Sequence, residues 1–234
     1  MYEAVHVAPD GDSPATDVVE RAARLGFEGV VVLARDATPE HDALRGASGI
    51  DVVDGVEVVA PDPERASGAV GGRRPNHTVL AVRGGTDRLN RFAVENERVD
   101  VLTRPMADDG DVNHVLANRA AENGVRIEFD LGPVLRSTGG PRVQALRDLR
   151  KLRELVVDAD APFVVSAGAP SRLGLRAPRE LVAVGETIGF DPDTVRAGLR
   201  EWGALAGRNR HRRSESFVEP GVERGPYEDD GGSR

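Results

Sequence analysis

Gly29-Val30-Val31-Val32-Leu33 is a short run of apolar, mostly β-branched residues without a charge. Such a run is typical of a strand buried on both faces, as in a parallel sheet covered by helices. Comparable runs recur at the spacing of strand-then-helix units. They occupy residues 5–8, 52–59, 78–82, 99–102, 125–131 and 163–166. The pattern therefore predicts seven parallel strands and an α/β fold.

Helix signals lie between these runs. Ser13-Pro14 and Thr38-Pro39 are typical of helix starts, Asp111 is a predicted N-cap, and Pro178 and Pro192 begin the last two predicted helices. The longest predicted helix covers about residues 141–157, because its apolar residues recur at helical spacing. The even spacing, and the lack of a glycine-rich dinucleotide turn after the first strand, favour a closed TIM-barrel-like (β/α) barrel over an open sheet.

Composition shifts predict the domain organisation. Residues 1–206 are expected to form a single (β/α) barrel domain, since no linker interrupts the strand–helix units. Residues 207–234 are rich in glycine and charge and poor in apolar groups, which predicts a disordered tail. Residues 61–76 are dense in Pro, Gly and Arg and are expected to form an exposed loop.

The amino-acid composition excludes several classes of protein. The 234 residues contain no cysteine, which rules out disulfides, thiolate zinc sites and a cysteine nucleophile. No charge-free apolar run approaches the roughly 18 residues of a membrane-spanning helix, and the acidic N-terminus is unlike a signal peptide. We therefore expect a cytoplasmic protein. The net charge is −8, and Lys151 is the only lysine among 31 basic residues, a balance that suggests adaptation to salt.

Most signatures of catalysis are missing. There is no phosphate-binding loop and no Gly-x-Ser-x-Gly elbow. Of five histidines only His6 lies near the end of a predicted strand, where a barrel metal site would need several ligands; the carboxylates expected there are Asp10, Glu57, Asp100, Glu128 and Asp130. One open alternative is nevertheless a stand-alone metal-dependent phosphoesterase that uses His6, Asp10, Glu128 and Asp130.

The positive charge is concentrated in one segment. Residues 131–180 carry nine basic and five acidic side chains in a protein of net charge −8. Arg172, Arg176 and Arg179 follow the seventh predicted strand, at the face of a barrel that carries function. Arginine forks bind phosphates bidentately, and scarce aromatic residues favour recognition of folded RNA by shape and backbone. A simpler interpretation of these arginines is that they form solvated salt bridges with neighbouring acidic residues. A structural subunit that contacts only other proteins is a further open alternative.

Four stretches carry a resemblance to a known family. They are Arg98-Val99-Asp100-Val101-Leu102-Thr103-Arg104-Pro105, Leu116-Ala117-Asn118-Arg119-Ala120-Ala121-Glu122-Asn123-Gly124-Val125-Arg126-Ile127-Glu128-Phe129-Asp130, Phe163-Val164-Val165-Ser166-Ala167-Gly168-Ala169 and Leu175-Arg176-Ala177-Pro178-Arg179-Glu180-Leu181. Over roughly residues 1–205 the chain resembles archaeal ribonuclease P protein component 3, which is related to the thirty-kilodalton subunit of the eukaryotic enzyme.

The resemblance implies a TIM-barrel-like fold, similar to polymerase-and-histidinol-phosphatase barrels but without their metal site. It implies a subunit that is non-catalytic by itself, in a ribonucleoprotein whose RNA removes the 5′ leader from precursor tRNA. Magnesium ions are then expected on the catalytic RNA and no cofactor on the protein. The implied partners are that RNA, precursor tRNA, protein component 2 and other protein subunits, and no membrane. Carried over residue by residue, the implied RNA-binding residues are Arg83, Arg104, Arg142, Arg172, Arg176 and Arg179.

Overall fold

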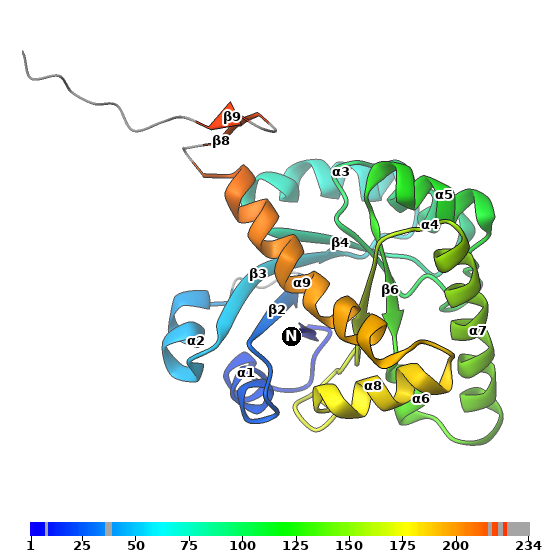
Figure 1. Ribbon diagram of the computed structural model, residues 1–234. Helices are drawn as coiled ribbons and strands as arrows, with labels where there is room; N and C mark the ends of the chain where they lie inside the picture. The colour runs from blue at the N-terminus through cyan, green and yellow to red at the C-terminus, as the bar shows by residue number, and fades with distance from the viewer. Residues whose placement is uncertain (8, 36–38, 215–216, 220–221, 224–234) are drawn as a thin grey trace, which may run out of the picture.

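Seven parallel strands form a nearly closed barrel in this computed structural model, which describes residues 1–7, 9–35, 39–214, 217–219 and 222–223 (Figure 1). The strands pair in chain order, and an isolated bridge between Val5 of β1 and Ala169, three residues after β7, links the two ends of the sheet. The predicted TIM-barrel-like fold is confirmed. The strands are β1 (Tyr2–His6), β2 (Gly29–Ala34), β3 (Asp51–Val58), β4 (Val79–Arg83), β5 (Val101–Thr103), β6 (Arg126–Asp130) and β7 (Phe163–Ser166).

Helices follow the strands and cover the outside of the barrel (Figure 1). Prolines at the first turn and glycines in the left-handed conformation mark several of their ends, as at Pro178 and Gly124. The helices are α1 (Ala15–Arg24), α2 (His41–Ser48), α3 (Pro63–Arg73), α4 (Asp87–Glu95), α5 (His114–Asn123), α6 (Gly132–Arg136), α7 (Gly139–Asp158), α8 (Pro178–Thr187) and α9 (Pro192–Arg212), with a short 3-10 helix η1 (Arg74–Asn76).

Alternation along the strands separates two apolar cores. In β2, Val30 and Val32 belong to the large core beneath the outer helices, whereas Val31 and Leu33 face the barrel interior. The interior core also contains Trp202 of α9. Both faces of β2 are therefore buried, which is why its sequence is apolar throughout.

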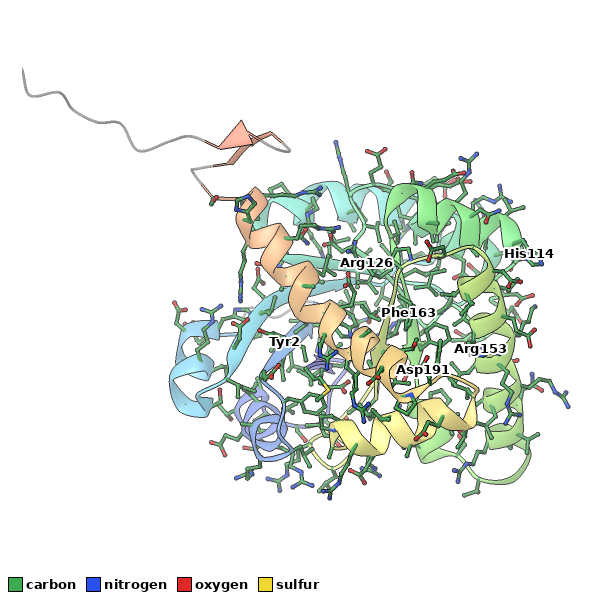
Figure 2. All side chains as sticks on the ribbon, in the orientation of Figure 1. Tyr2, His114, Arg126, Arg153, Phe163 and Asp191 are labelled. Carbon is green, nitrogen blue, oxygen red and sulfur yellow. The ribbon has the colours of Figure 1, made fainter. Side chains whose placement is uncertain are left out.

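Helix α9 closes the end of the barrel where the strands begin. Its N-cap Asp191 accepts hydrogen bonds from the backbone N–H groups of Asp193 and Thr194 at 3.0 and 2.9 Å (Figure 2). Further along, Arg210 donates to both carboxylate oxygens of Asp51, at 2.7 and 2.9 Å. Arg126, at the start of β6, donates to Glu201 Oε1 at 2.9 Å. The partners of α9 thus come from several strands at once.

The structure corrects three local predictions. Residues 61–76 are not a loop: α3 forms there, because Asp62 caps it and Ala66 and Val70 are buried. The cap of α5 is Asn113 rather than Asp111, whose carboxylate instead accepts a hydrogen bond from Lys151. The predicted boundary at residue 206 lies six residues before α9 ends at Arg212.

The predicted tail is described only in part. Beyond α9, strands β8 (Phe217–Glu219) and β9 (Val222–Glu223) pair antiparallel. Residues 215–216, 220–221 and 224–234 lie outside the described residues, so disorder there stays a prediction. Ala8 and Thr38, which the sequence placed at the end of a strand and at a helix start, also lie outside them. Among the described helices, none has both the length and the apolar character needed to cross a membrane.

Trp202 offers a test of how α9 contributes to folding. The side chain is fully buried, and its Nε1–H donates to the Val165 carbonyl at 3.0 Å. We expect Trp202→Ala to lower the free energy of unfolding by roughly 3–5 kcal/mol, because a large cavity opens inside the barrel. Urea unfolding followed by circular dichroism measures this. Val157→Ala, at an exposed position of α7, is the control, and an equal small loss in both variants would contradict the role of α9.

Candidate functional site

Polar side chains fill the barrel interior where the strands end. His6, Glu57, Arg83, Thr103, Glu128, Asp130 and Ser166 all occupy inward-facing positions at the carboxyl ends of β1, β3, β4, β5, β6 and β7. In a (β/α) barrel this end carries the functional groups. We call these seven residues the mouth cluster.

Glu57 is neutralised by an arginine from the neighbouring strand. The carboxylate is 1% exposed, and Arg83 donates to its Oε2 through Nε, at 3.1 Å, and through Nη2. Thr103 Oγ1 donates to Oε1 at 2.5 Å. Burial alone would raise the pKa of Glu57, but the nearby charges of His6 and Arg83 and these hydrogen bonds lower it. Glu57 is therefore an ionised carboxylate held by a guanidinium.

Glu128 has the opposite protonation state. It is buried, with Ser166 Oγ donating to its Oε1 at 2.6 Å and the backbone N–H of Arg104 donating to its Oε2 at 3.0 Å. Burial, followed by the charge of Asp130, raises its pKa to about 8. Burial likewise raises the pKa of Glu3, whose Oε1 accepts from the Ala167 N–H at 2.8 Å. Near neutral pH the carboxyl group of Glu128 is therefore held largely uncharged.

Asp130 is fixed by close approach of two backbone segments. Its Oδ1 accepts from the Gly132 N–H at 2.7 Å, and its Oδ2 lies 3.7 Å from Nε of Arg104. Gly168 has φ +52°, and a Cβ there would lie 2.2 Å from Oδ1. Glycine is therefore required where the segment after β7 passes over this carboxylate.

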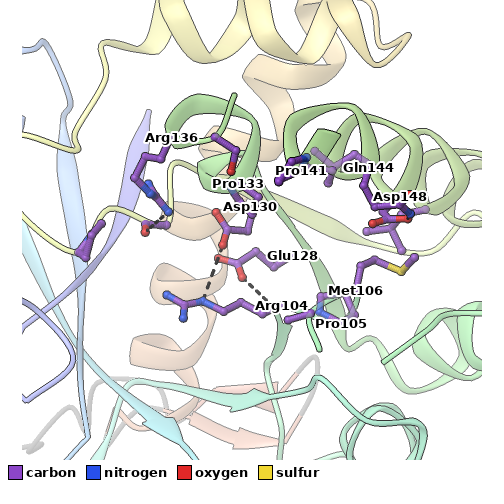
Figure 3. A pocket seen from close by; sticks show the side chains of 17 residues that line it. Arg104, Pro105, Met106, Glu128, Asp130, Pro133, Arg136, Pro141, Gln144 and Asp148 are labelled. Carbon is purple, nitrogen blue, oxygen red and sulfur yellow. Dashed lines mark hydrogen bonds and ion pairs between the residues drawn. The ribbon is translucent and has the colours of Figure 1, made fainter. Parts of the chain in front are cut away.

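A pocket of about 610 Å³ opens beside Glu128 and Asp130 (Figure 3). Arg104 and Arg136 lie on one side of it, with the strand ends, and Gln144 and Asp148 of α7 lie on the other. Arg136 donates to the carbonyls of Ala167 and Gly168 at 2.8 and 3.0 Å, which ties α6 to the segment after β7. The pocket is therefore held between rigid walls.

The residues of the mouth do not fit a metal ion. Asp10 lies 3.5 Å from Arg35 and 3.7 Å from Arg83, and Arg104 faces Asp130. His6 Nδ1 lies 3.8 Å from Glu57, and burial lowers the pKa of His6. Guanidinium groups thus stand where a cation would have to bind. Within the described residues, no three His, Asp or Glu side chains are arranged to hold a metal.

One of the carboxylates that the sequence predicted at the mouth of the barrel lies elsewhere. Asp100 was expected at the carboxyl end of a strand, but it precedes β5 and lies at the opposite end of the barrel. There its carboxylate accepts hydrogen bonds from Arg74, from Asn209 at 2.9 Å and from the backbone N–H of Leu80 at 2.8 Å. Asp100 therefore contributes to closure by α9 and not to the mouth.

Comparison with known proteins decides the family. A family model described as RNase P subunit p30 matches residues 1–214. Ribonuclease P protein component 3 of Halorubrum lacusprofundi is 58% identical, covering 99% of this chain and 100% of the relative. The protein of the same name from Haloarcula marismortui is also 58% identical, with 95% and 96% covered. The chain belongs to the ribonuclease P subunit p30 family. Membership confirms the resemblance found in the sequence.

Solved structures agree with this fold. A chain in the cryo-EM structure of archaeal ribonuclease P with mature tRNA aligns with a TM-score of 0.81 and 22% identity, over 95% of this chain and 97% of that one. A histidinol phosphate phosphatase from Lactococcus lactis, complexed with zinc, L-histidinol and phosphate, aligns with a TM-score of 0.54 and 8% identity, over 81% and 94%. This p30-family chain therefore shares a barrel with a zinc protein, but its own mouth contains arginines. The alternative of a metal-dependent phosphoesterase is not favoured.

The six arginines expected to bind RNA fall into two groups in this p30-family chain. Arg83 and Arg104 belong to the mouth of the barrel and face the buried Glu57 and the partly exposed Asp130. The other four, which we call the outer arginines, lie outside the mouth. Arg142 is in α7, Arg172 and Arg176 are in the segment between β7 and α8, and Arg179 is in α8. Their assignment to RNA stays a prediction, because the chain is described without RNA.

The four outer arginines differ in how they are engaged. Arg172 pairs with Asp17 at 3.0 Å, and Arg176 donates to the carbonyls of Leu173 and Leu175, both at 3.0 Å. Arg142 and Arg179 are exposed and make no ion pair within the described part of the chain. These two guanidinium groups are thus the most available for phosphate.

Sequence reasoning missed the pairing of Arg83 with Glu57 and the clamp formed by Arg136. The signal that could have found them is a charged side chain at the last inward position of successive strands. Glu57, Arg83 and Asp130 occupy such positions, and an apolar strand that ends in an inward charge requires a partner.

The raised pKa of Glu128 predicts a pH-dependent stability. The folded protein keeps this proton up to about pH 8, whereas the unfolded chain releases it near pH 4.5. The contribution is complete below about pH 4.5 and is lost as the pH rises through about 8. Glu128→Gln removes the titrating carboxyl group, so the variant does not lose this contribution to stability as the pH rises. We therefore expect its melting temperature, relative to the unmodified protein, to rise steadily between about pH 5 and pH 9.

Thermal melts over that pH range measure the difference. Glu154→Gln, which removes an exposed carboxyl on α7, is the control. The assignment fails if Glu128→Gln behaves in the same way as this control.

Proposed function

We propose that this chain is a protein subunit of the ribonuclease P ribonucleoprotein, which cleaves the 5′ leader from precursor tRNA. In this role it binds the catalytic RNA and supports its active fold together with a partner subunit, protein component 2. The observation that carries the proposal is the p30-family match over residues 1–214. The two relatives 58% identical to this chain are both named ribonuclease P protein component 3.

The mouth cluster supports a role without catalysis by the protein itself. Its carboxylates face arginines or are held protonated, so they are poorly placed to bind metal ions or activate water. We propose that hydrolysis depends on magnesium ions bound by the RNA. The chain would then contribute positive charge and shape, since arginine forks contact phosphates without reading the bases.

The basic segment supports RNA binding through its outer arginines. Arg142 lies at the start of α7 and Arg179 at the start of α8, and both side chains are exposed. Molar salt would screen charges beyond about 3 Å, so only direct phosphate contacts would persist in a salt-adapted protein. Arg142 and Arg179 can make such contacts without first breaking an ion pair.

Removing the two available arginines tests the interface. We expect Arg142→Gln with Arg179→Gln to weaken binding of ribonuclease P RNA and to reduce the slope of log affinity against log salt by about 1–2, because each phosphate contact releases bound counterions. Filter binding over a salt series measures both effects. The melting temperature should stay unchanged, since neither residue has an ion-pair partner in the described chain.

The matched control removes the same charge elsewhere. Arg91→Gln with Arg119→Gln deletes two exposed arginines that pair with Glu95 and Glu122 on α4 and α5. Equal losses of RNA affinity in both double variants would mean that net charge, and not this surface, governs binding. That result would contradict the assignment.

A further inference from the structure

The pocket beside the mouth cluster has features that phosphate binding does not explain. From its walls, its hydrogen-bonding groups and its rim, we propose that it binds one unstacked nucleobase of the RNA through a hydrogen-bond-donating edge, which guanine presents best. The inference rests on the proposed function. It adds a base-recognition site to a surface otherwise suited only to phosphates.

The size and the walls of the pocket suit a planar apolar body. Its volume of about 610 Å³ lies within the range of small-molecule sites. Met106 after β5 and Leu149 and Leu152 of α7 line it, together with Pro133 and Pro141. Bases taken out of RNA stacks are commonly held against aromatic rings or guanidinium planes. Here aliphatic side chains and Arg104 would supply those surfaces.

The hydrogen-bonding groups inside the pocket favour a donor edge. Asp130 and Asp148 line it with carboxylate oxygens, and Asp130 is 11% exposed. Guanine carries two adjacent N–H donors on its pairing edge, and these match the two oxygens of one carboxylate. The phosphodiester group of RNA carries no donor that could pair with these oxygens. The interior therefore suits a base and not the backbone of RNA.

An exposed arginine adjoins the pocket lining along α7. Arg142 follows the lining residue Pro141, is exposed and has no ion pair in the described chain. A nucleotide whose base entered the pocket could place its phosphate near this guanidinium. Arg104 and Arg136 also line the pocket and would repel a basic protein side chain, which favours a neutral base of RNA as the occupant.

The pocket is also built before any ligand arrives. Arg136 ties α6 to the segment after β7. A Cβ at position 132 would lie 1.9 Å from Nη2 of Arg136, so Gly132 leaves room for this guanidinium. The N–H of Gly132 holds Asp130 at 2.7 Å. A carboxylate fixed in this way is preorganised, so little conformational freedom would be lost on binding.

Photocrosslinking tests the proposal on the full chain. Ribonuclease P RNA of Halorubrum lacusprofundi is transcribed with 6-thioguanosine or, in parallel, with 4-thiouridine. Each complex is irradiated and the crosslinked peptides are identified by mass spectrometry. We expect the thioguanosine RNA to crosslink to Met106 or to residues 144–152, and the thiouridine RNA to leave those residues unmodified.

Two variants sharpen the test. Ala145→Phe fills the pocket from α7 and should reduce this crosslink about tenfold or more, since a stacked base contributes of that order to affinity. Val157→Phe adds the same ring at an exposed position of α7 that is not among the lining residues, and should leave the crosslink unchanged. Fluorescence of Trp202 and circular dichroism confirm that both variants fold.

Each other outcome has one meaning. Intact RNA binding with no thioguanosine crosslink at the pocket overturns this inference and leaves the proposed function standing. Equal crosslinking by thiouridine overturns the donor-edge assignment. If Ala145→Phe blocks association with a protein subunit while RNA crosslinks persist, the pocket holds a protein side chain and the proposal is wrong. Failure of the unmodified chain to bind the RNA overturns the proposed function first and this inference with it.

Discussion

The pairing of buried carboxylates with arginines at the barrel mouth is the interaction on which the rest of the site depends. A barrel that converges strand ends brings Glu57, Glu128 and Asp130 together, and ionised carboxylates away from water are costly unless they are neutralised. The chain uses two solutions: Arg83 holds Glu57 in its charged form, and burial keeps Glu128 protonated. Both remove the negative charge that would attract a metal ion.

This arrangement separates two uses of arginine within one chain. Arg83, Arg104 and Arg136 act inside the fold, where the planar fork reaches carboxylates and carbonyls that a lysine ammonium could not bridge. Arg142 and Arg179 stay outside, exposed and without ion pairs in the described chain. The arginines predicted from sequence to bind RNA thus include structural cations, Arg83 and Arg104, as well as candidates for phosphate, and only the second group can respond strongly to salt.

The sequence predicted the strands well because both faces of each strand are buried, as in the uniformly apolar β2. It was less successful where polar and small residues dominate. The glycine-rich stretch around α3 looks like a loop, yet Asp62 and Pro63 start a helix and two buried side chains hold it. Similarly, α9 extends to Arg212 because Asn209 and Arg210 find partners at the strand starts, which composition cannot reveal.

The sequence by itself determined the seven strand–helix units of the barrel, the p30-family resemblance and the concentration of positive charge, because periodicity, motifs and charge are local properties of the chain. Only the tertiary structure decided which arginines are available, where Asp100 lies and that a pocket exists beside Asp130. The physical reason is that ion pairs and cavities form between residues distant in the sequence: Arg83 lies 26 positions from Glu57, and Arg136 lies 31 from Ala167. Such contacts exist only once the barrel has closed.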